Sequence, residues 1–181
     1  MGVRYVLEET ARGHWSITGS ISPNVKLRYR YLNPMGDGWY SRYTQTFYWD
    51  EDKDTGLEAR GDLERVISPA TLFRTTLNAD YWNGETGVNW LVGGALLHRI
   101  NDRNAIAYDI SANGVSEPDW EPTQYRAGLR FRRNFFRSWL FYEVEPVLRW
   151  TQDPLVETDS MTFDPVVTVR LEIQFGKVRG L

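Results

Sequence analysis

The sequence predicts an all-β fold: an antiparallel, up-and-down transmembrane β-barrel of about ten to twelve strands, in a single domain over residues 1–181. Three observations support this prediction. Apolar and charged residues alternate with a period of two, as in Val166–Phe175, and successive side chains of a strand point to opposite sides. Strand-like segments recur between turn-forming residues. Aromatic residues make up 14% of the chain, which suits the interfacial girdles of a membrane barrel.

The first half of the chain contains six expected strands. In Val25–Leu32 the apolar and aromatic positions alternate with Lys26, Arg28 and Arg30, so one face is cationic. The Pro- and Gly-containing segment Asn33–Gly38 predicts a short turn after it. The expected strands are Val3–Glu8, His14–Ile21, Val25–Leu32, Trp39–Trp49, Leu57–Ile67 and Leu72–Trp82.

The second half contains five more, and its alternation is the most regular. In Trp139–Thr151 one face carries Glu143 and Glu145 while the other is apolar and aromatic. Typical segment lengths match the roughly 9–11 residues that a tilted strand needs to cross a bilayer. The expected strands are Val88–Arg99, Ala105–Asn113, Tyr125–Phe136, Trp139–Thr151 and Val166–Phe175.

This count is odd, whereas single-chain bacterial barrels have an even number of strands. Either Val3–Glu8 is a tail and the barrel has ten strands, or one strand precedes it and the parent protein has twelve; we favour twelve. Met1 leads into Val3 without the basic start and apolar stretch of a signal peptide. We therefore expect a mature, trimmed or re-engineered chain that lacks its signal peptide and, if the count is twelve, one N-terminal strand.

Composition excludes two classes of protein. The net charge of −3 argues against nucleic-acid binding, which needs a basic field. No run of about 18 apolar residues occurs, so a transmembrane helix is excluded. The mean hydropathy of −0.49 does not exclude a membrane barrel, because only every second residue of its strands meets lipid. The absence of cysteine fits an oxidising compartment but is weak evidence.

The connections alternate between short turns and longer acidic loops, as in bacterial outer-membrane barrels, where the short turns are periplasmic. The long loops carry half of the 24 carboxylates and a single lysine, Lys53, so we expect them to face outside the cell. The short connections are Asn33–Gly38, Ser68–Ala70, Ile100–Asn104 and Arg137–Ser138. The long ones are Asp50–Gly56, Asn83–Thr86, Gly114–Thr123 and Gln152–Pro165.

Alternation alone does not say which face lies inside. In a soluble ligand-binding barrel the apolar face lines the cavity, and in a membrane barrel it faces lipid. Strand number, strand length and the many long charged side chains of both signs favour the arrangement in which the apolar face meets lipid. A soluble ligand-binding barrel is the alternative. Aromatic residues near strand ends favour it too: Trp39, Trp49, Trp82, Tyr142, Trp150 and Phe175.

The charged face predicts a lumen filled by cross-strand ion pairs, which would stiffen a narrow, largely occluded barrel of structural or passive role. The clearest expected pairing places Arg126, Arg130 and Arg132 beside Glu143 and Glu145. Because cations slightly outnumber anions, a narrow porin-like channel for small solutes or anions is the alternative. The lumen residues are Lys26, Arg28, Arg30, Arg42, Glu58, Arg60, Asp62, Glu64, Arg74, Asp80, Asp109, Arg126, Arg130, Arg132, Glu143, Glu145, Arg149, Arg170 and Glu172.

Three segments, 132–146, 168–175 and 25–31, resemble the penultimate hairpin, the last strand and an early strand of a family of uncharacterised proteobacterial outer-membrane β-barrel proteins. The resemblance implies a bacterial outer-membrane location, lipid contact and insertion by the barrel-assembly machinery, and it carries no assigned activity. In that family a segment like Gly2–Glu8 is a strand with another before it. The residues of the implied assembly signal are Val167, Val169, Leu171, Ile173 and Phe175.

Two weaker patterns concern chemistry. His14 and Ser16 lie two apart on one strand face, as in outer-membrane lipid hydrolases, but spacing identifies no third residue to orient the histidine. Asp50, Asp52 and Asp54 resemble the start of a calcium loop, but the glycine falls late and position twelve is Gly61 rather than Glu. We expect no enzyme activity, no cofactor and no metal, with the lipid hydrolase as an alternative.

Overall fold

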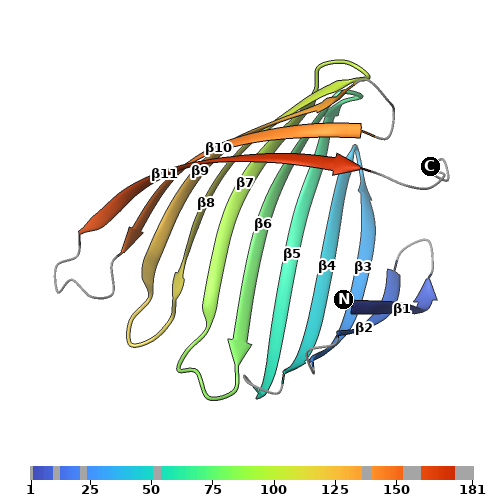
Figure 1. The fold of residues 1–181 in the computed structure, drawn as a ribbon. Helices are drawn as coiled ribbons and strands as arrows, with labels where there is room; N and C mark the ends of the chain where they lie inside the picture. Colours follow the sequence, from blue (N-terminus) through green and yellow to red (C-terminus); the bar gives the residue numbers. More distant parts are fainter. Residues whose placement is uncertain are drawn as a thin grey trace.

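The computed structural model describes residues 2–9, 13–20, 24–50, 54–135, 140–152 and 160–173. Within these ranges the chain forms one antiparallel sheet of 11 strands in sequence order, so each strand pairs with the next along the chain (Figure 1). The strands are β1 (Gly2–Glu9), β2 (Gly13–Ser20), β3 (Asn24–Gly36), β4 (Trp39–Asp50), β5 (Asp54–Ser68), β6 (Thr71–Trp82), β7 (Asn89–Arg99), β8 (Asn104–Val115), β9 (Glu121–Asn134), β10 (Leu140–Gln152) and β11 (Met161–Ile173).

Short hairpins place consecutive strands side by side. Between β3 and β4, Gly36, Asp37 and Gly38 have φ angles of 89°, 51° and 76°, a left-handed conformation that glycine adopts without steric cost. The Val66 amide donates to the Gly38 carbonyl at 2.8 Å and ties this turn to β5. Because the strands alternate in direction, successive connections lie at opposite rims of the sheet (Figure 1).

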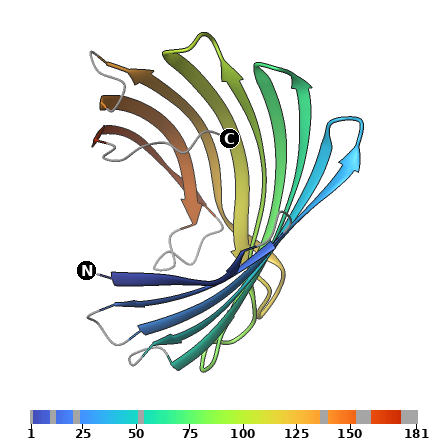
Figure 2. The same cartoon turned by 90° about the vertical axis from the view of Figure 1, so that its right-hand side faces the viewer.

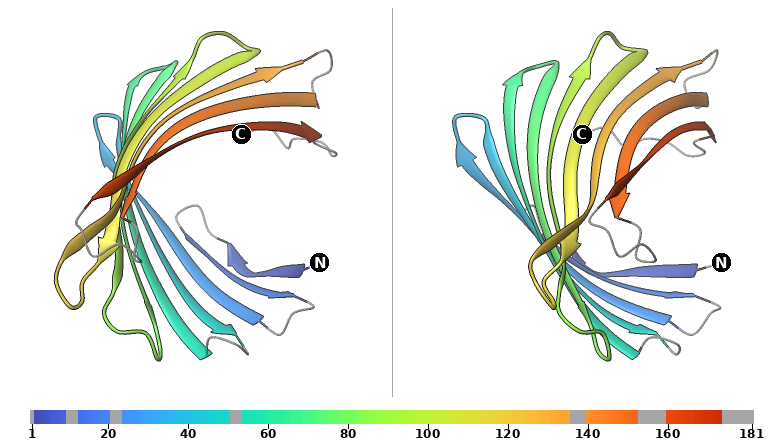
Figure 3. Two further views of the ribbon diagram at one scale, coloured as in Figure 1. Left: turned by 60° about the vertical axis from the view of Figure 1, so that its left-hand side comes forward. Right: turned by 90° about the vertical axis from the view of Figure 1, so that its left-hand side faces the viewer.

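The sheet curls strongly, and its two edge strands are β1 and β11 (Figures 2 and 3). No pairing joins β1 to β11 within the described residues, so the described sheet is open at this seam. Neighbouring strands alternate in direction, so β1 and β11 run the same way, and an all-antiparallel ring would need an even number of strands. Twelve strands in the parent protein stays a prediction.

The solvent exposure of charged and apolar side chains is inverted relative to a soluble protein. Glu145 and Asp62 are each 4% exposed, whereas Val169 and Leu171 are 71% and 69% exposed. The cross-strand register places the buried carboxylates on one face and the exposed apolar residues on the other. Figure 3 shows that the sheet is strongly concave. Side chains on the concave side of a curled sheet are more crowded, so we call the face with the buried carboxylates the inner face and the other the outer face. The charged inner residues of these strands do not form the apolar lining that a soluble ligand-binding barrel requires.

Each of the eleven expected segments coincides with a strand, but several bounds are wrong. β11 begins at Met161 rather than Val166, because Phe163 and Asp164 pair in register with Trp150 and Arg149. β3 likewise continues to Gly36, and β5 begins at Asp54. Hydrogen-bonded pairing with a neighbour therefore extends strands into turn-like sequence. Among the described residues, no helix is long and apolar enough to cross a membrane.

The aromatic residues near strand ends are only partly on the outer face. Trp49 and Trp150 pair in register with Val25 and Tyr125 on that face. Trp82 differs: it lies on the inner face, 5.4 Å from the Tyr48 ring, and covers Gly56, where a Cβ would stand 2.8 Å from the indole. The expectation that Trp82 belongs to an outer girdle is wrong, because Gly56 leaves room for its ring inside. Phe175 lies outside the described residues.

Candidate functional site

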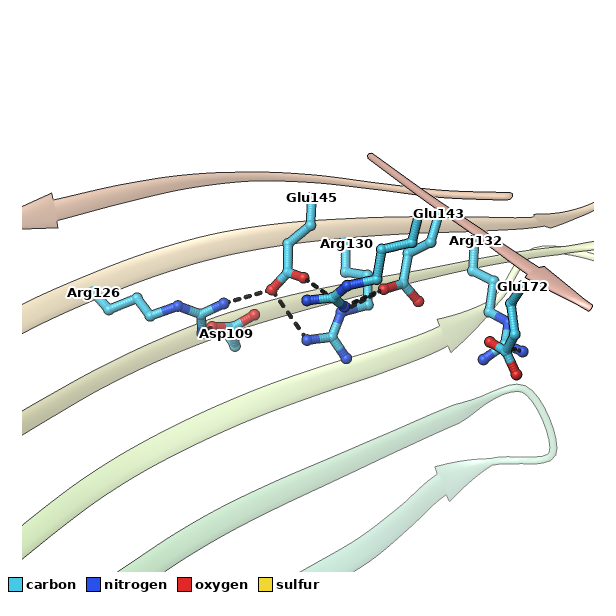
Figure 4. Close-up of polar contacts among 8 residues, drawn as sticks. Asp109, Arg126, Arg130, Arg132, Glu143, Glu145 and Glu172 are labelled. Atoms are coloured by element: carbon cyan, nitrogen blue, oxygen red, sulfur yellow. Dashed lines mark hydrogen bonds and ion pairs between the residues drawn. The ribbon is translucent and has the colours of Figure 1, made fainter. Parts of the chain in front are cut away.

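The inner face of β8–β11 is a wall of matched charges, which we call the C-terminal wall. At its centre the Glu145 carboxylate accepts from Arg126 at 2.6 Å and Arg130 at 3.1 Å, and Arg170 lies 3.3 Å away (Figure 4). Glu143 lies 2.8 Å from Arg170 and 3.7 Å from Arg130. The charged residues of the wall are Asp109, Arg126, Arg130, Arg132, Glu143, Glu145, Arg149, Asp164, Arg170 and Glu172.

Strand register and one glycine assemble this wall. Glu143 stands directly between Arg132 on β9 and Arg170 on β11. Gly128 pairs with Asp109, and a Cβ at Gly128 would lie 2.7 Å from the Asp109 carboxylate. The missing side chain therefore leaves space for Asp109 to lie across β9 and bind Arg126. Charge-assisted bonds of this kind are stronger where water is partly excluded.

The N-terminal wall, the inner face of β3–β6, is also ion-paired, but only in part. Glu64 lies 2.8 Å from Arg74 and 3.4 Å from Arg42. Asp62 binds Arg60 at 3.0 Å and accepts from the Thr76 hydroxyl at 2.6 Å. Its members are Lys26, Arg28, Arg30, Arg42, Thr44, Thr46, Tyr48, Glu58, Arg60, Asp62, Glu64, Arg74 and Thr76.

Two cations of β3, Lys26 and Arg28, meet neutral groups of this wall. Arg28 donates to the fully buried Thr46 hydroxyl at 3.3 Å, and the Lys26 ammonium lies 5.1 Å from the centre of the Tyr48 ring. Tyr48 in turn donates to Glu58. Within the described part of the chain, neither Lys26 nor Arg28 has a carboxylate at ion-pair distance. A hollow of about 290 Å³ opens here, lined by Arg28, Arg30, Arg42, Thr44, Glu58, Arg60 and Asp62.

The inner face is less polar at the short-turn rim. A second hollow, of about 460 Å³, is lined there by aliphatic residues such as Val66, Leu72 and Leu97, and also by Arg130, Arg132 and Glu143. The predicted charged face therefore gives way to aliphatic side chains near this rim.

The structure brings most predicted lumen residues together, with some changes of partner. Arg126 and Arg130 bind Glu145 as expected, whereas Arg132 reaches past the expected glutamates to Glu172 at 2.9 Å. Asp80 lies 3.3 Å from the Asn89 side chain, and Arg149 binds Asp164.

Two kinds of inner-face residue were missed. Asp164 was predicted to lie in a loop. The alternation through Thr168, Val166 and Asp164 indicates instead that the strand extends to it, with its side chain on the inner face. The hydroxyl-bearing Thr44, Thr46 and Tyr48 continue the alternation of their strand and show no charge to mark them.

The weaker chemical predictions lie mostly at the limit of the described residues. Asp50 and Asp54 pair across the β4–β5 ladder, and Asp52 lies outside the described residues. Among the described residues, no three or more acidic or histidine side chains lie close enough together to bind a metal ion. The register pairs His14 with Arg30 and Ser16 with Arg28.

The fold and the inverted faces define a class: antiparallel, up-and-down β-sheets with a charged inner face and an apolar outer face. Two solved structures are similar over almost the whole chain. A NanC porin, solved in a rhombohedral crystal form, matches with a TM-score of 0.65 and 8% identity, over 96% of this chain and 92% of that one. A KdgM porin in complex with disordered oligogalacturonate matches with a TM-score of 0.59 and 6% identity, over 97% and 92%. No protein-family model matches the chain, and no curated protein matches it. At such identities the likeness establishes the fold.

Proposed function

We propose that this chain forms a β-barrel in the outer membrane of a Gram-negative bacterium and provides a passage for small hydrophilic solutes. One observation carries the proposal: carboxylates are buried on the inner face while large apolar side chains are exposed on the outer face. Such an outer surface is costly in water and favourable in lipid, and a closed barrel satisfies every backbone group in the bilayer. The similarity to two porin structures supports the same conclusion.

The passage itself is supported by the polar hollow on the N-terminal wall, whose lining is charged and hydroxyl-bearing. The similar KdgM porin is described in complex with an acidic oligosaccharide, which agrees with a solute channel. A largely occluded barrel of structural role is the second candidate. The observation that favours it is the close ion pairing of the C-terminal wall.

The test is refolding of the full chain from urea, with and without detergent, followed by reconstitution into planar lipid bilayers. A compact, heat-sensitive band on gels only in detergent, together with discrete conductance steps, is the expected result. Heat-sensitive folding without conductance would support the occluded barrel instead. Folding in plain buffer would contradict a membrane barrel of either kind.

Two further expectations attach to this proposal. The exposed row Val167, Val169 and Leu171 on β11 is available to the assembly machinery during insertion, and a lower yield of inserted barrel for Val169→Asp in cells tests that role. A lipid hydrolase at His14 and Ser16 is the weaker alternative. It predicts lipid turnover by the refolded chain that Ser16→Ala abolishes, and equal turnover in both proteins would dismiss it.

A further inference from the structure

The arginines of the N-terminal wall are arranged around a short side chain. The register places Arg30, Thr44 and Arg60 in one row across β3, β4 and β5. Strands lie about 4.8 Å apart, so the backbones of Arg30 and Arg60 are roughly 10 Å apart with only Thr44 between them. Thr44 is 8% exposed, and its small side chain forms part of the lining of the 290 Å³ hollow.

Cations outnumber anions around this hollow. Four arginines line it against two carboxylates, Glu58 and Asp62. Both carboxylates are already engaged: Glu58 accepts from Tyr48, and Asp62 binds Arg60 and Thr76. Among the residues whose side chains are described, Arg28 donates to the Thr46 hydroxyl and to no carboxylate. The hollow is therefore an electropositive recess with guanidinium groups on two sides.

The C-terminal wall shows what such arginines bind elsewhere in this molecule. There Glu145 lies among three guanidinium groups, at 2.6, 3.1 and 3.3 Å. The equivalent central position of the N-terminal wall holds Thr44, which brings a hydroxyl but no charge. A planar guanidinium matches a carboxylate with two parallel hydrogen bonds, so a carboxylate supplied from solution suits this recess.

We propose that the hollow formed by Arg28, Arg30, Arg42, Thr44 and Arg60 is a binding site for the carboxylate group of a small anionic solute. The site rests on the proposed function for its access, since solutes reach it through the lumen. It would make the passage selective for anions. It assigns that selectivity to the inner face of β3–β5, where four arginines and Lys26 face three carboxylates, rather than to β8–β11, where five arginines face five carboxylates.

The experiment measures citrate binding to the detergent-folded full chain by calorimetry, and the zero-current potential of bilayer channels in a KCl gradient. Replacing Arg28 and Arg30 together by glutamine should weaken citrate binding by about tenfold or more and reduce the preference for chloride over potassium. The matched control removes two arginines from the outer face, Arg65→Gln with Arg133→Gln. The loss of net charge is the same, and citrate binding should be unchanged.

A second variant tests the site without removing an arginine. Thr44→Glu places a carboxylate where the solute should bind, so it should abolish citrate binding while the barrel stays folded by the gel assay. Thr151→Glu, the same change on the inner face of β10, should leave binding intact. Equal effects of the two glutamates would overturn the proposal, because binding would then reflect only the overall charge of the lumen.

Failure of the site and failure of the channel are distinguishable. Conductance with unchanged selectivity and no citrate binding would refute the site and leave the passage standing. Citrate binding that is lost in the Arg28 and Arg30 double variant, in a barrel without conductance, would support the site and refute the passage.

Discussion

The C-terminal wall on β8–β11 and the N-terminal wall on β3–β6 both carry rows of arginines, but they differ in what faces those arginines. In the C-terminal wall, all five arginines contact a carboxylate of the chain. In the N-terminal wall, Arg42, Arg60 and Arg74 also contact carboxylates. Arg28 instead meets the Thr46 hydroxyl, and Lys26 meets the Tyr48 ring. Similar sequence patterns thus build a neutralised, stiff wall on one side and an electropositive recess on the other.

The comparison shows that the effect of a charged side chain depends on both its sign and its position on the sheet. Cross-strand neighbours decide whether a charge is used within the protein or left to act on a solute. Glu145 on β10 and Thr44 on β4 each lie between arginine-bearing strands, and the difference of one carboxylate separates a structural cluster from a candidate binding site. The following predictions test that contrast, beginning with the largest effect.

Glu145→Ala should lower the free energy of unfolding most, because it removes the central carboxylate of the C-terminal wall. It leaves Arg126, Arg130 and Arg170 close together without their central carboxylate, and removing one partner of a buried ion pair costs about 3–5 kcal/mol. The measurement is the free energy of unfolding in phospholipid vesicles by denaturant titration. Glu172→Ala is the control, because the Glu172 side chain is 47% exposed against 6% for Glu145, and its pair with Arg132 should contribute less than about 1 kcal/mol. Similar losses for both variants would contradict a centre at Glu145.

Leu77→Arg on β6 and Leu148→Arg on β10 test whether the two walls are alike on their outer faces. Both leucines are exposed on the outer face, one behind each wall. If the walls differ only on their inner faces, each arginine should destabilise the vesicle-inserted barrel by a similar amount, about 2–4 kcal/mol near the bilayer centre. Leu77→Ala and Leu148→Ala give the baseline for lost apolar contact. Two arginine variants as stable as the wild type would show that this face does not meet lipid.

Gly128→Ala should give a smaller loss, confined to the C-terminal wall. Its Cβ would stand 2.7 Å from the Asp109 carboxylate and displace it from Arg126, and overpacking of this kind typically costs about 1–3 kcal/mol. The matched change is Gly61→Ala on β5, where nothing lies within 4 Å of a new Cβ. That variant should be neutral or more stable by up to about 1 kcal/mol, because alanine suits a strand better than glycine. Unfolding titrations of the two proteins compare them directly, and a stable Gly128→Ala would show that Asp109 does not need this space.

Much of the fold was predictable because it depends on local pattern. Alternation in segments such as Val25–Leu32 and Trp139–Thr151 gave the strands, their order and their two faces, and the similarity to porin structures confirms the fold class. Strand bounds were less predictable. Asp164 and Gly36 belong to strands because a neighbouring strand bonds to them, and single-strand patterns do not contain that information.

The candidate site was predictable in its residue types but not in its partners. The cluster of Arg126 and Arg130 with Glu145 follows from opposite charges on adjacent strands, and it was expected. The recess at Thr44 was not, because a threonine carries no charge pattern and its importance lies in the arginines on both sides of it. Trp82 was assigned to the wrong face for a similar reason, since Gly56 on the next strand makes room for it.

The sequence by itself determined that the chain forms long antiparallel strands with one apolar and one charged face, because side-chain direction alternates along any strand. Only the tertiary structure decided which face is concave, which arginine meets which carboxylate, and which of the described cations, such as Arg28, contacts a hydroxyl instead. Those outcomes depend on curvature and on the register between strands distant from one another in the chain, and a shift of one residue would exchange the two faces.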